Sequence, residues 1–119
     1  MAERVNNRGS IVKVRLSPTE GREQSGVRPG VVVSATFFNE RSDLLVVLPI
    51  TSQKVDRIHP FEVFLDPEPC GLDLPSKVMA NQVRTVDKSR VVGMYGIADA
   101  ETMKRIDAAL QLTLGLVEL

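Results

Sequence analysis

The sequence predicts an α+β fold, in which a small, strongly bent antiparallel sheet or partial barrel carries one packed helix. Short segments rich in β-branched or alternating apolar residues follow one another between residues 11 and 95. After residue 99 the apolar residues recur at three- and four-residue spacing, the period of one helix face. The 119 residues suffice for one hydrophobic core, so we expect a single domain over residues 1–119.

The N-terminal quarter is expected to hold a tail, a strand and a loop. Residues 1–8 are predicted to be a flexible tail. Residues 11–16 alternate apolar and mostly basic side chains, which is typical of a half-buried strand. Residues 17–26 form a long polar loop, of a length that often carries function in a compact domain.

The second and third strands are expected to form a hairpin. Residues 30–38 are β-branched and aromatic, and residues 44–51 are apolar on both faces, which predicts a central strand. Residues 39–43 are expected to form the turn between them. Pro49 has no backbone N–H to donate, so it indicates a bulge or the frayed end of the pairing.

The register of this hairpin would decide which side chains meet. With a turn centred near Arg41, Thr51 lies opposite Val31, or opposite Gly30 if Pro49 forms a bulge. Both registers bring Arg28 and Thr51 to the same end of the sheet.

Residues 60–65, 77–86 and 91–95 are expected to be further strands, with a turn over residues 66–71. The helix should run from about residue 100 to residue 117, with Asp99 as its N-cap. Its apolar stripe is predicted to pack in the core; the stripe consists of Met103, Ile106, Leu110 and Leu114.

Composition excludes several classes of protein. No apolar run approaches the roughly 18 residues of a membrane helix, and the first residues lack the apolar region of a signal peptide. A single cysteine, Cys70, excludes an internal disulfide and fits a reducing cytosol, so a cytoplasmic location is expected. No cluster of histidine, cysteine and acidic residues has metal-ligand spacing, and no cofactor is expected. His59 is the only histidine and is read as a loop residue.

Arg28 and Thr51 are the residue types that a phosphoryl-transfer site without a metal would use. Arg28 offers a planar fork of donors that suits phosphate oxygens, and Pro29 restricts the backbone before it. Thr51 offers a hydroxyl that can donate to a phosphoryl oxygen. Such donors stabilise charge that develops in a transition state.

Three segments, Gly26 to Ser34, Pro49 to Gln53 and Asn81 to Lys88, together resemble the MazF/PemK/Kid family of toxin endoribonucleases. The resemblance covers nearly the whole chain and depends on the order and spacing of these segments. It implies a partial SH3-like barrel of the CcdB/PemK type with a C-terminal helix, working as a homodimer. It also implies cleavage of single-stranded RNA at a short sequence without a metal, as an mRNA interferase. The products would carry a 2′,3′-cyclic phosphate and a 5′-hydroxyl.

The resemblance also assigns residues. Arg28 and Thr51 match the catalytic pair of the family, and Glu23 matches an acidic residue of the MazF branch that takes up a proton or orients the arginine. An arginine is a poor proton carrier because its guanidinium holds its proton very tightly, so Arg28 is assigned electrostatic stabilisation, and the general acid and base stay open. Met79 and Asn81 stand where the Kid branch has an arginine and an aspartate, so the chain follows the MazF branch.

Other polar residues are expected to contact the RNA. They are Gln24, Ser52, Gln53, Gln82 and Arg84. Gln24 adjoins Glu23, whereas Ser52 and Gln53 adjoin Thr51 and would reach a base or a phosphate. For Gln82 and Arg84 two interpretations stand side by side: they line the RNA groove, or they only complete a strand.

The expected partners follow from the same resemblance. They are the RNA substrate, a cognate MazE-like antitoxin, operator DNA reached through the antitoxin complex, and a second copy of the chain. Two alternatives remain open at this point. One is a CcdB-like toxin that binds gyrase and cuts nothing, and the other is a former toxin that survives only as a co-repressor with its antitoxin.

Overall fold

The computed structural model describes residues 2–16, 21 and 26–118. Within this part of the chain, seven strands form one antiparallel sheet in the order β4-β5-β3-β2-β1-β7, with β6 paired to β3 beside β5. The elements are, in chain order, α1 (Ala2–Val5), β1 (Ser10–Arg15), β2 (Val27–Val32), α2 (Thr36–Arg41), β3 (Leu44–Thr51), β4 (Glu62–Leu65), α3 (Pro67–Cys70), β5 (Ser76–Met79), η1 (Ala80–Gln82), β6 (Arg84–Asp87), η2 (Lys88–Arg90), β7 (Val91–Ile97) and α4 (Ala100–Thr113). The predicted α+β class, a bent antiparallel sheet with a C-terminal helix, is confirmed.

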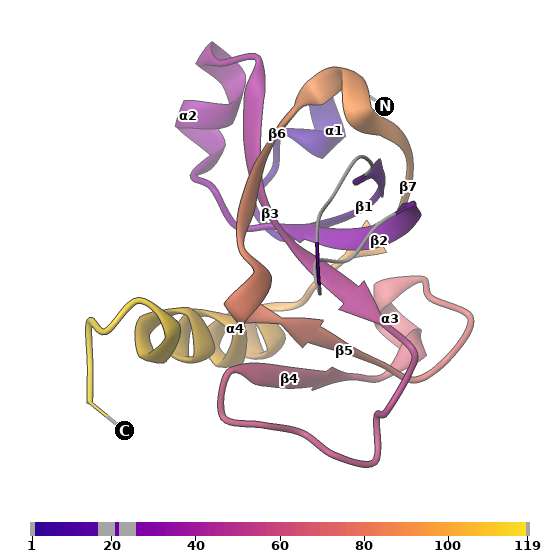
Figure 1. The fold of residues 1–119 in the computed structure, drawn as a ribbon. Helices are drawn as coiled ribbons and strands as arrows, with labels where there is room; N and C mark the ends of the chain where they lie inside the picture. The colour runs from indigo at the N-terminus through magenta and orange to yellow at the C-terminus, as the bar shows by residue number, and fades with distance from the viewer. Residues whose placement is uncertain (1, 17–20, 22–25, 119) are drawn as a thin grey trace.

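Strand β3 joins the two parts of the sheet. In its first half, Val47 pairs with Val32 of β2 on one side and with Arg84 of β6 on the other. At its end, Thr51 pairs with Lys77 of β5. In Figure 1, β1, β2, β6 and β7 lie in the upper part of the molecule, β4, β5 and α4 lie in the lower part, and β3 runs from one to the other. The end of β3 is therefore where the two parts of the sheet meet.

Both faces of β3 are buried, as its continuous apolar sequence predicts. Leu48 and Ile50 belong to a core that includes Ile106 of α4. Leu45 and Val47 belong to a second core on the opposite face, and each of these four side chains is at most 1% exposed. Because side chains alternate along a strand, a single strand supplies both cores and its position is strongly specified.

The connection between β2 and β3 differs from the predicted hairpin. The second strand ends at Val32 instead of residue 38, and α2 replaces the turn expected over residues 39–43. As a result Gly30 lies opposite Pro49, whereas the two predicted registers place it opposite Ser52 or opposite Thr51. Both predicted registers are therefore wrong. The helix α2 lengthens the connection between β2 and β3. It moves the pairing of the two strands by three positions from the register predicted with a turn at Arg41.

A buried asparagine explains why this segment is helical despite its strand-like composition. The Asn39 side chain is fully buried, and its amide donates to the carbonyl of Asn6 at 2.8 Å and to that of Ser34 at 3.0 Å. Phe37, in contrast, is 66% exposed. Burial of a fully hydrogen-bonded amide has thus overridden the strand propensity of the neighbouring aromatic residues.

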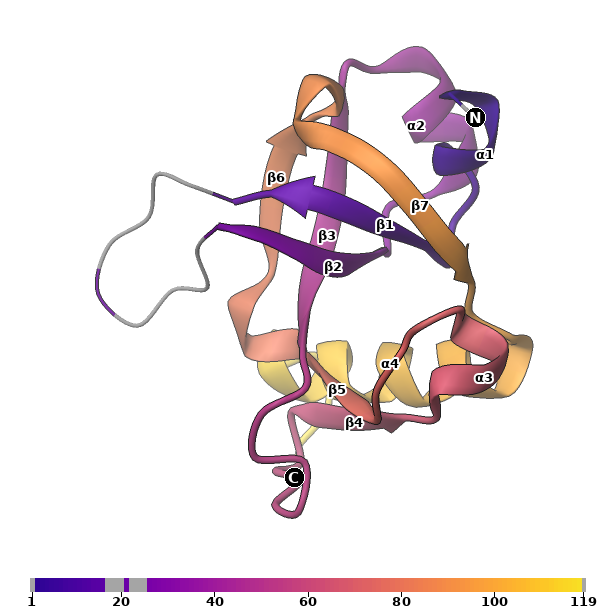
Figure 2. The same cartoon turned by 90° about the vertical axis from the view of Figure 1, so that its right-hand side faces the viewer.

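The loose tail predicted over residues 1–8 is wrong for its described part, residues 2–8. Ala2–Val5 form α1, and the Val5 side chain is only 6% exposed in the second core. Arg8 donates from Nε to the carbonyl of Val33 at 2.8 Å and forms an ion pair with Asp107 of α4. Figure 2 shows α1 beside α2 at one end of the molecule, with α4 near the other.

The C-terminal half keeps the predicted order of strands, with β4 shorter and β7 longer than expected and with α3 inside the predicted turn over residues 66–71. Residues 77–86, expected to be one strand, divide into β5, the turn η1 and β6. Asp99 caps α4 as predicted, because its carboxylate accepts the Thr102 backbone N–H at 2.8 Å. The helix ends at Thr113, so Leu114 is 57% exposed and does not extend the core stripe. Gly115 follows with φ of 72°, a left-handed conformation that ends helices.

Among the described residues, no helix combines the length and the hydrophobicity needed to span a membrane.

Candidate functional site

Arg28 lies near the start of β2, opposite Val14 of β1, and is half-buried. Its side chain lines a hollow of about 160 Å³, together with Ser52, Asp73 and Tyr95. We call this the Arg28 hollow. It combines an arginine fork with a serine hydroxyl, which are groups that can bind phosphate oxygens.

Thr51 is the last residue of β3, and only 7% of its surface is exposed. Its hydroxyl oxygen accepts the backbone N–H of Gln53 at 3.1 Å, which fixes the chain as it leaves the strand. The residue lines a second hollow of about 360 Å³, with Gln53, Lys54, Arg57 and Gln82 among its other lining residues. We call this the Thr51 hollow.

The two hollows lie at the same end of the sheet and share the end of β3. Ile50 and Ser52 line the Arg28 hollow, whereas Thr51 and Gln53 line the Thr51 hollow. This alternation is what a strand end produces, because successive side chains point to opposite faces. Arg28 and Thr51 thus reach the same end of the sheet, as predicted, but each lines its own hollow.

A buried ion pair lies in the Thr51 hollow. Lys77 Nζ lies 3.1 Å from Glu62 Oε1, and these side chains are only 6% and 7% exposed. Lys77 Nζ also donates to the Arg57 carbonyl at 2.9 Å, and Glu62 Oε1 also accepts the His59 backbone N–H at 3.0 Å. The pair connects β5 to the segment between β3 and β4. The sequence does not predict this ion pair, because only the pairing of β4 with β5 reveals that the two residues are neighbours.

The remaining predicted contacts divide between the two hollows. Ser52 lines the Arg28 hollow, and Gln53 and Gln82 line the Thr51 hollow. Gln82 lies in η1, where its side-chain amide contacts the Met79 sulfur at 3.7 Å. For Gln82 the groove interpretation therefore fits its position better than that of a strand residue.

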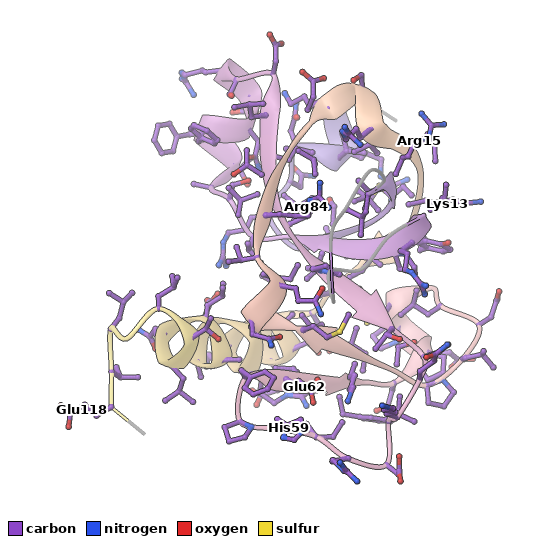
Figure 3. The ribbon with its side chains drawn as sticks, in the orientation of Figure 1. Lys13, Arg15, His59, Glu62, Arg84 and Glu118 are labelled. Carbon is purple, nitrogen blue, oxygen red and sulfur yellow. The ribbon has the colours of Figure 1, made fainter. Side chains whose placement is uncertain are left out.

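Arg84 is placed differently. It lies in β6, and its guanidinium donates from Nη1 to the Leu16 carbonyl at 3.0 Å. Figure 3 shows Arg84 well above Glu62 and His59, which both line the Thr51 hollow. Arg84 thus lies in a strand and contacts the residue that follows β1, and its expected contact with RNA stays a prediction.

Glu23 and Gln24 lie outside the described residues. Within the part that is described, no group of three or more histidine, cysteine or acidic side chains is arranged to hold a metal ion.

The surroundings of the single histidine and of the single cysteine indicate structural roles for both. His59 is an exposed loop residue, as predicted, and its ring stacks on Phe61 with centroids 5.2 Å apart. Cys70 is the last residue of α3 and is 1% exposed, in the core. Burial raises the pKa of the Cys70 thiol, and Asp99 and Asp66 raise it further. The protonated thiol is a poor nucleophile, so Cys70 is a structural residue of the core.

Comparison with known proteins relates this geometry to a family. Residues 7–114 match the family model described as PemK-like, MazF-like toxin of type II toxin–antitoxin system. The chain is 35% identical over 111 residues to Endoribonuclease EndoA of Bacillus subtilis (strain 168). The aligned region covers 93% of this chain and 96% of that protein.

Solved structures agree with this match. The crystal structure of MazF (Form-I) from Deinococcus radiodurans superposes with a TM-score of 0.78 at 31% identity, over 92% of this chain and 96% of that one. A mycobacterial endoribonuclease in complex with its cognate antitoxin superposes with a TM-score of 0.79 at 25% identity, over 95% of this chain and 98% of that one. Fold and sequence point the same way, and the chain belongs to the PemK-like, MazF-like toxin family of type II toxin–antitoxin systems.

Proposed function

We propose that this protein is an endoribonuclease toxin that cleaves single-stranded RNA at a short sequence, as an mRNA interferase, with Arg28 and Thr51 as its catalytic residues. The observation that carries the proposal is the position of these two residues at one end of the sheet, on either side of the end of β3. The identity of 35% with an endoribonuclease over nearly the full chain supports the activity.

The reaction proposed is an internal transfer at phosphorus. The 2′-oxygen of one ribose attacks the adjacent phosphate, the P–O5′ bond breaks, and the 2′-hydroxyl proton leaves to a base while the 5′-oxygen gains a proton. The products are a 2′,3′-cyclic phosphate and a 5′-hydroxyl. Arg28 stabilises the extra negative charge on the phosphorus oxygens as the 2′-oxygen adds, and the Thr51 hydroxyl donates to one of them. Glu23 is assigned to take up a proton or to orient Arg28.

The electrostatics of the site are consistent with these roles. A guanidinium stays charged at every pH that the protein meets, so Arg28 acts as a fixed positive charge and leaves proton transfer to other groups. Thr51 is held by the Gln53 N–H and by pairing with Lys77, so its position is defined before the RNA binds. A donor that is already in place does not need to reorganise during the reaction.

The partners and the location belong to the same proposal. The protein acts in the cytoplasm as a homodimer, and a MazE-like antitoxin keeps it silent and links it to operator DNA. Support comes from the mycobacterial structure, which is a complex of an endoribonuclease with its antitoxin, and from a Deinococcus radiodurans MazE–MazF structure with a TM-score of 0.72 at 30% identity.

The CcdB-like alternative is less well supported, because the curated relative is an endoribonuclease and the structural relatives are MazF toxins. One experiment separates the two functions. Purified protein is incubated with a long RNA in EDTA, and the fragment ends are sequenced and tested for cyclic phosphate. Discrete fragments with cyclic phosphate ends are expected. Intact RNA together with arrested gyrase would instead identify a gyrase-directed toxin, and intact RNA with operator binding would identify a co-repressor.

A further inference from the structure

The Thr51 hollow carries positive charge that no described group neutralises. Lys54 and Arg57 both line it, and in the described part of the chain neither side chain has a hydrogen-bond or ion-pair partner. Among the described residues that line the hollow, Glu62 is the one carboxylate, and it is already paired with Lys77. Within the described part of the chain, the hollow therefore has two cations without a side-chain partner at its rim and a neutral ion pair inside it.

The backbone at this rim has an unusual conformation. Lys54 has φ of 53°, and among the described residues no other non-glycine residue has a positive φ. A lysine seldom adopts this left-handed conformation, which persists only where the surrounding structure enforces it. The conformation determines the direction in which the Lys54 side chain leaves the chain, beside the hollow that it lines.

The segment bearing these cations is held by the buried ion pair. Residues 52–54 and 56–60 are exposed, so apolar burial contributes little to fixing them. Lys77 binds the Arg57 carbonyl and Glu62 accepts the His59 N–H, so the pair fixes the segment at two points. Lys77 is also the residue opposite Thr51, so one side chain relates the rim to the proposed catalytic threonine.

We propose that the Thr51 hollow binds one backbone phosphate of the single-stranded RNA, with Lys54 and Arg57 as its ligands and the Lys77–Glu62 pair as the element that positions them. This inference rests on the proposed function, because it takes RNA as the substrate. Two cations that share a small hollow, and that have no side-chain partner among the described residues, suit an anion with several acceptor oxygens. The uncharged amides of Gln53 and Gln82 complete the lining and can donate to the same group.

Salt dependence tests the phosphate contacts. The probe is a random-sequence single-stranded RNA with 2′-O-methyl groups at every position, which cannot be cut by its own 2′-hydroxyls. For each single-strand phosphate contact that is removed, the slope of log K against log salt falls by about 0.7. The double variant Lys54→Asn/Arg57→Ala removes both ligands of this one phosphate and is expected to reduce the slope by that amount, which is a salt effect about 2.6-fold smaller between about 50 and about 200 mM. Arg57→Ala and Lys54→Asn alone are each expected to reduce the slope by part of that amount. Asparagine tolerates the left-handed backbone, so Lys54→Asn removes only the charge.

Lys104→Ala provides the matched control. Lys104 is an exposed lysine on α4, and alanine suits a helix, so the slope should stay that of the parent. Unchanged slopes for both Arg57→Ala and Lys54→Asn would overturn the proposal. Variants that bind RNA like the parent but lose affinity for the antitoxin would also overturn the proposal, because the occupant of the Thr51 hollow would then be a protein.

The positioning role has its own test. The double variant Lys77→Met/Glu62→Gln removes one positive and one negative charge, so the net charge of the hollow is unchanged. We expect it to bind the methylated RNA several-fold more weakly, with both rim cations still present. Asp107→Asn breaks the ion pair with Arg8 elsewhere in the fold and should leave RNA binding unchanged. Parent-like binding by the double variant would remove the positioning role.

Cleavage of a long unmodified RNA is measured on the same proteins. A parent that binds the methylated RNA with the expected slopes but cuts nothing would contradict the proposed function and leave this phosphate site standing. A parent that cuts RNA, with variants whose slopes do not change, would contradict the phosphate site alone.

Discussion

Lys77 of β5 lies directly opposite Thr51 of β3, and its ammonium group lies 3.1 Å from Glu62 in a nearly buried ion pair. The pair joins three segments: β5, the start of β4, and the exposed connection that follows Thr51. A buried ion pair is a poor source of net stability, because two charges lose their water. Its effect here is geometric, because it sets how the connection leaves the sheet beside the proposed catalytic residue.

Replacing one partner of this pair should destabilise the protein strongly. Lys77→Met leaves the Glu62 carboxylate buried without its cation, and breaking such a pair costs about 3–5 kcal/mol. The free energy of unfolding from urea titration measures the loss. Lys77→Met/Glu62→Gln should recover most of it, because no unpaired charge remains. A single variant as stable as the parent would show that water reaches the carboxylate.

Removing either proposed catalytic group should abolish cleavage while the fold is retained. Loss of one preorganised donor to a developing oxyanion costs about 10²–10³ in rate, so Arg28→Ala and Thr51→Ala should each lower the initial rate by at least that factor. Thermal unfolding checks the fold of both variants. Thr51→Ser keeps the hydroxyl and is the matched control, with most of the activity expected. Two variants as active as the parent would exclude the assignment of this pair.

A comparison of two glycines tests how closely α3 packs on β7. Gly71 has φ of 77°, and a Cβ there would lie 2.2 Å from the Tyr95 carbonyl oxygen. Gly115 has a similar φ of 72°, but in the described part of the chain no atom beyond its two neighbouring residues lies within 4 Å of its Cβ position. Gly115→Ala should therefore cost only the left-handed strain, about 1–2 kcal/mol. Gly71→Ala should cost clearly more, as measured by chemical unfolding, and equal losses would contradict the close approach.

Stability should fall in acid partly because of the cap of α4. The Thr102 N–H that bonds to Asp99 lowers the pKa of this carboxyl below its ordinary value of 3.8. A carboxyl with a lower pKa in the folded state adds stability above its unfolded pKa, and this stability is lost as the pH falls through the folded pKa. Asp99→Asn keeps a capping oxygen without a titrating group. Its stability should therefore change less than that of the parent between about pH 5 and about pH 2. Parallel acid curves would show that Asp99 does not contribute.

Much of the fold could be predicted from local patterns in the sequence. Apart from Thr51 at its end, the buried residues of β3 are apolar, and its limits were predicted correctly because both faces lie in cores. Asp99 was recognised as a cap because a side-chain oxygen directly before a helical repeat commonly accepts a backbone N–H of the first turn. The segment after β2 was predicted wrongly, because the contacts that make it helical come from Asn6, more than thirty residues away.

The sequence by itself determined the class of fold, the family and the two residues proposed for catalysis, because periodicity and the order of motifs are properties of the linear chain. Only the tertiary structure decided that Arg28 and Thr51 line separate hollows, that Arg84 contacts the residue that follows β1, and that Lys77 and Glu62 form a pair. The physical reason is strand register. A helix inserted between β2 and β3 moves every cross-strand neighbour, and alternation then decides on which face each side chain lies.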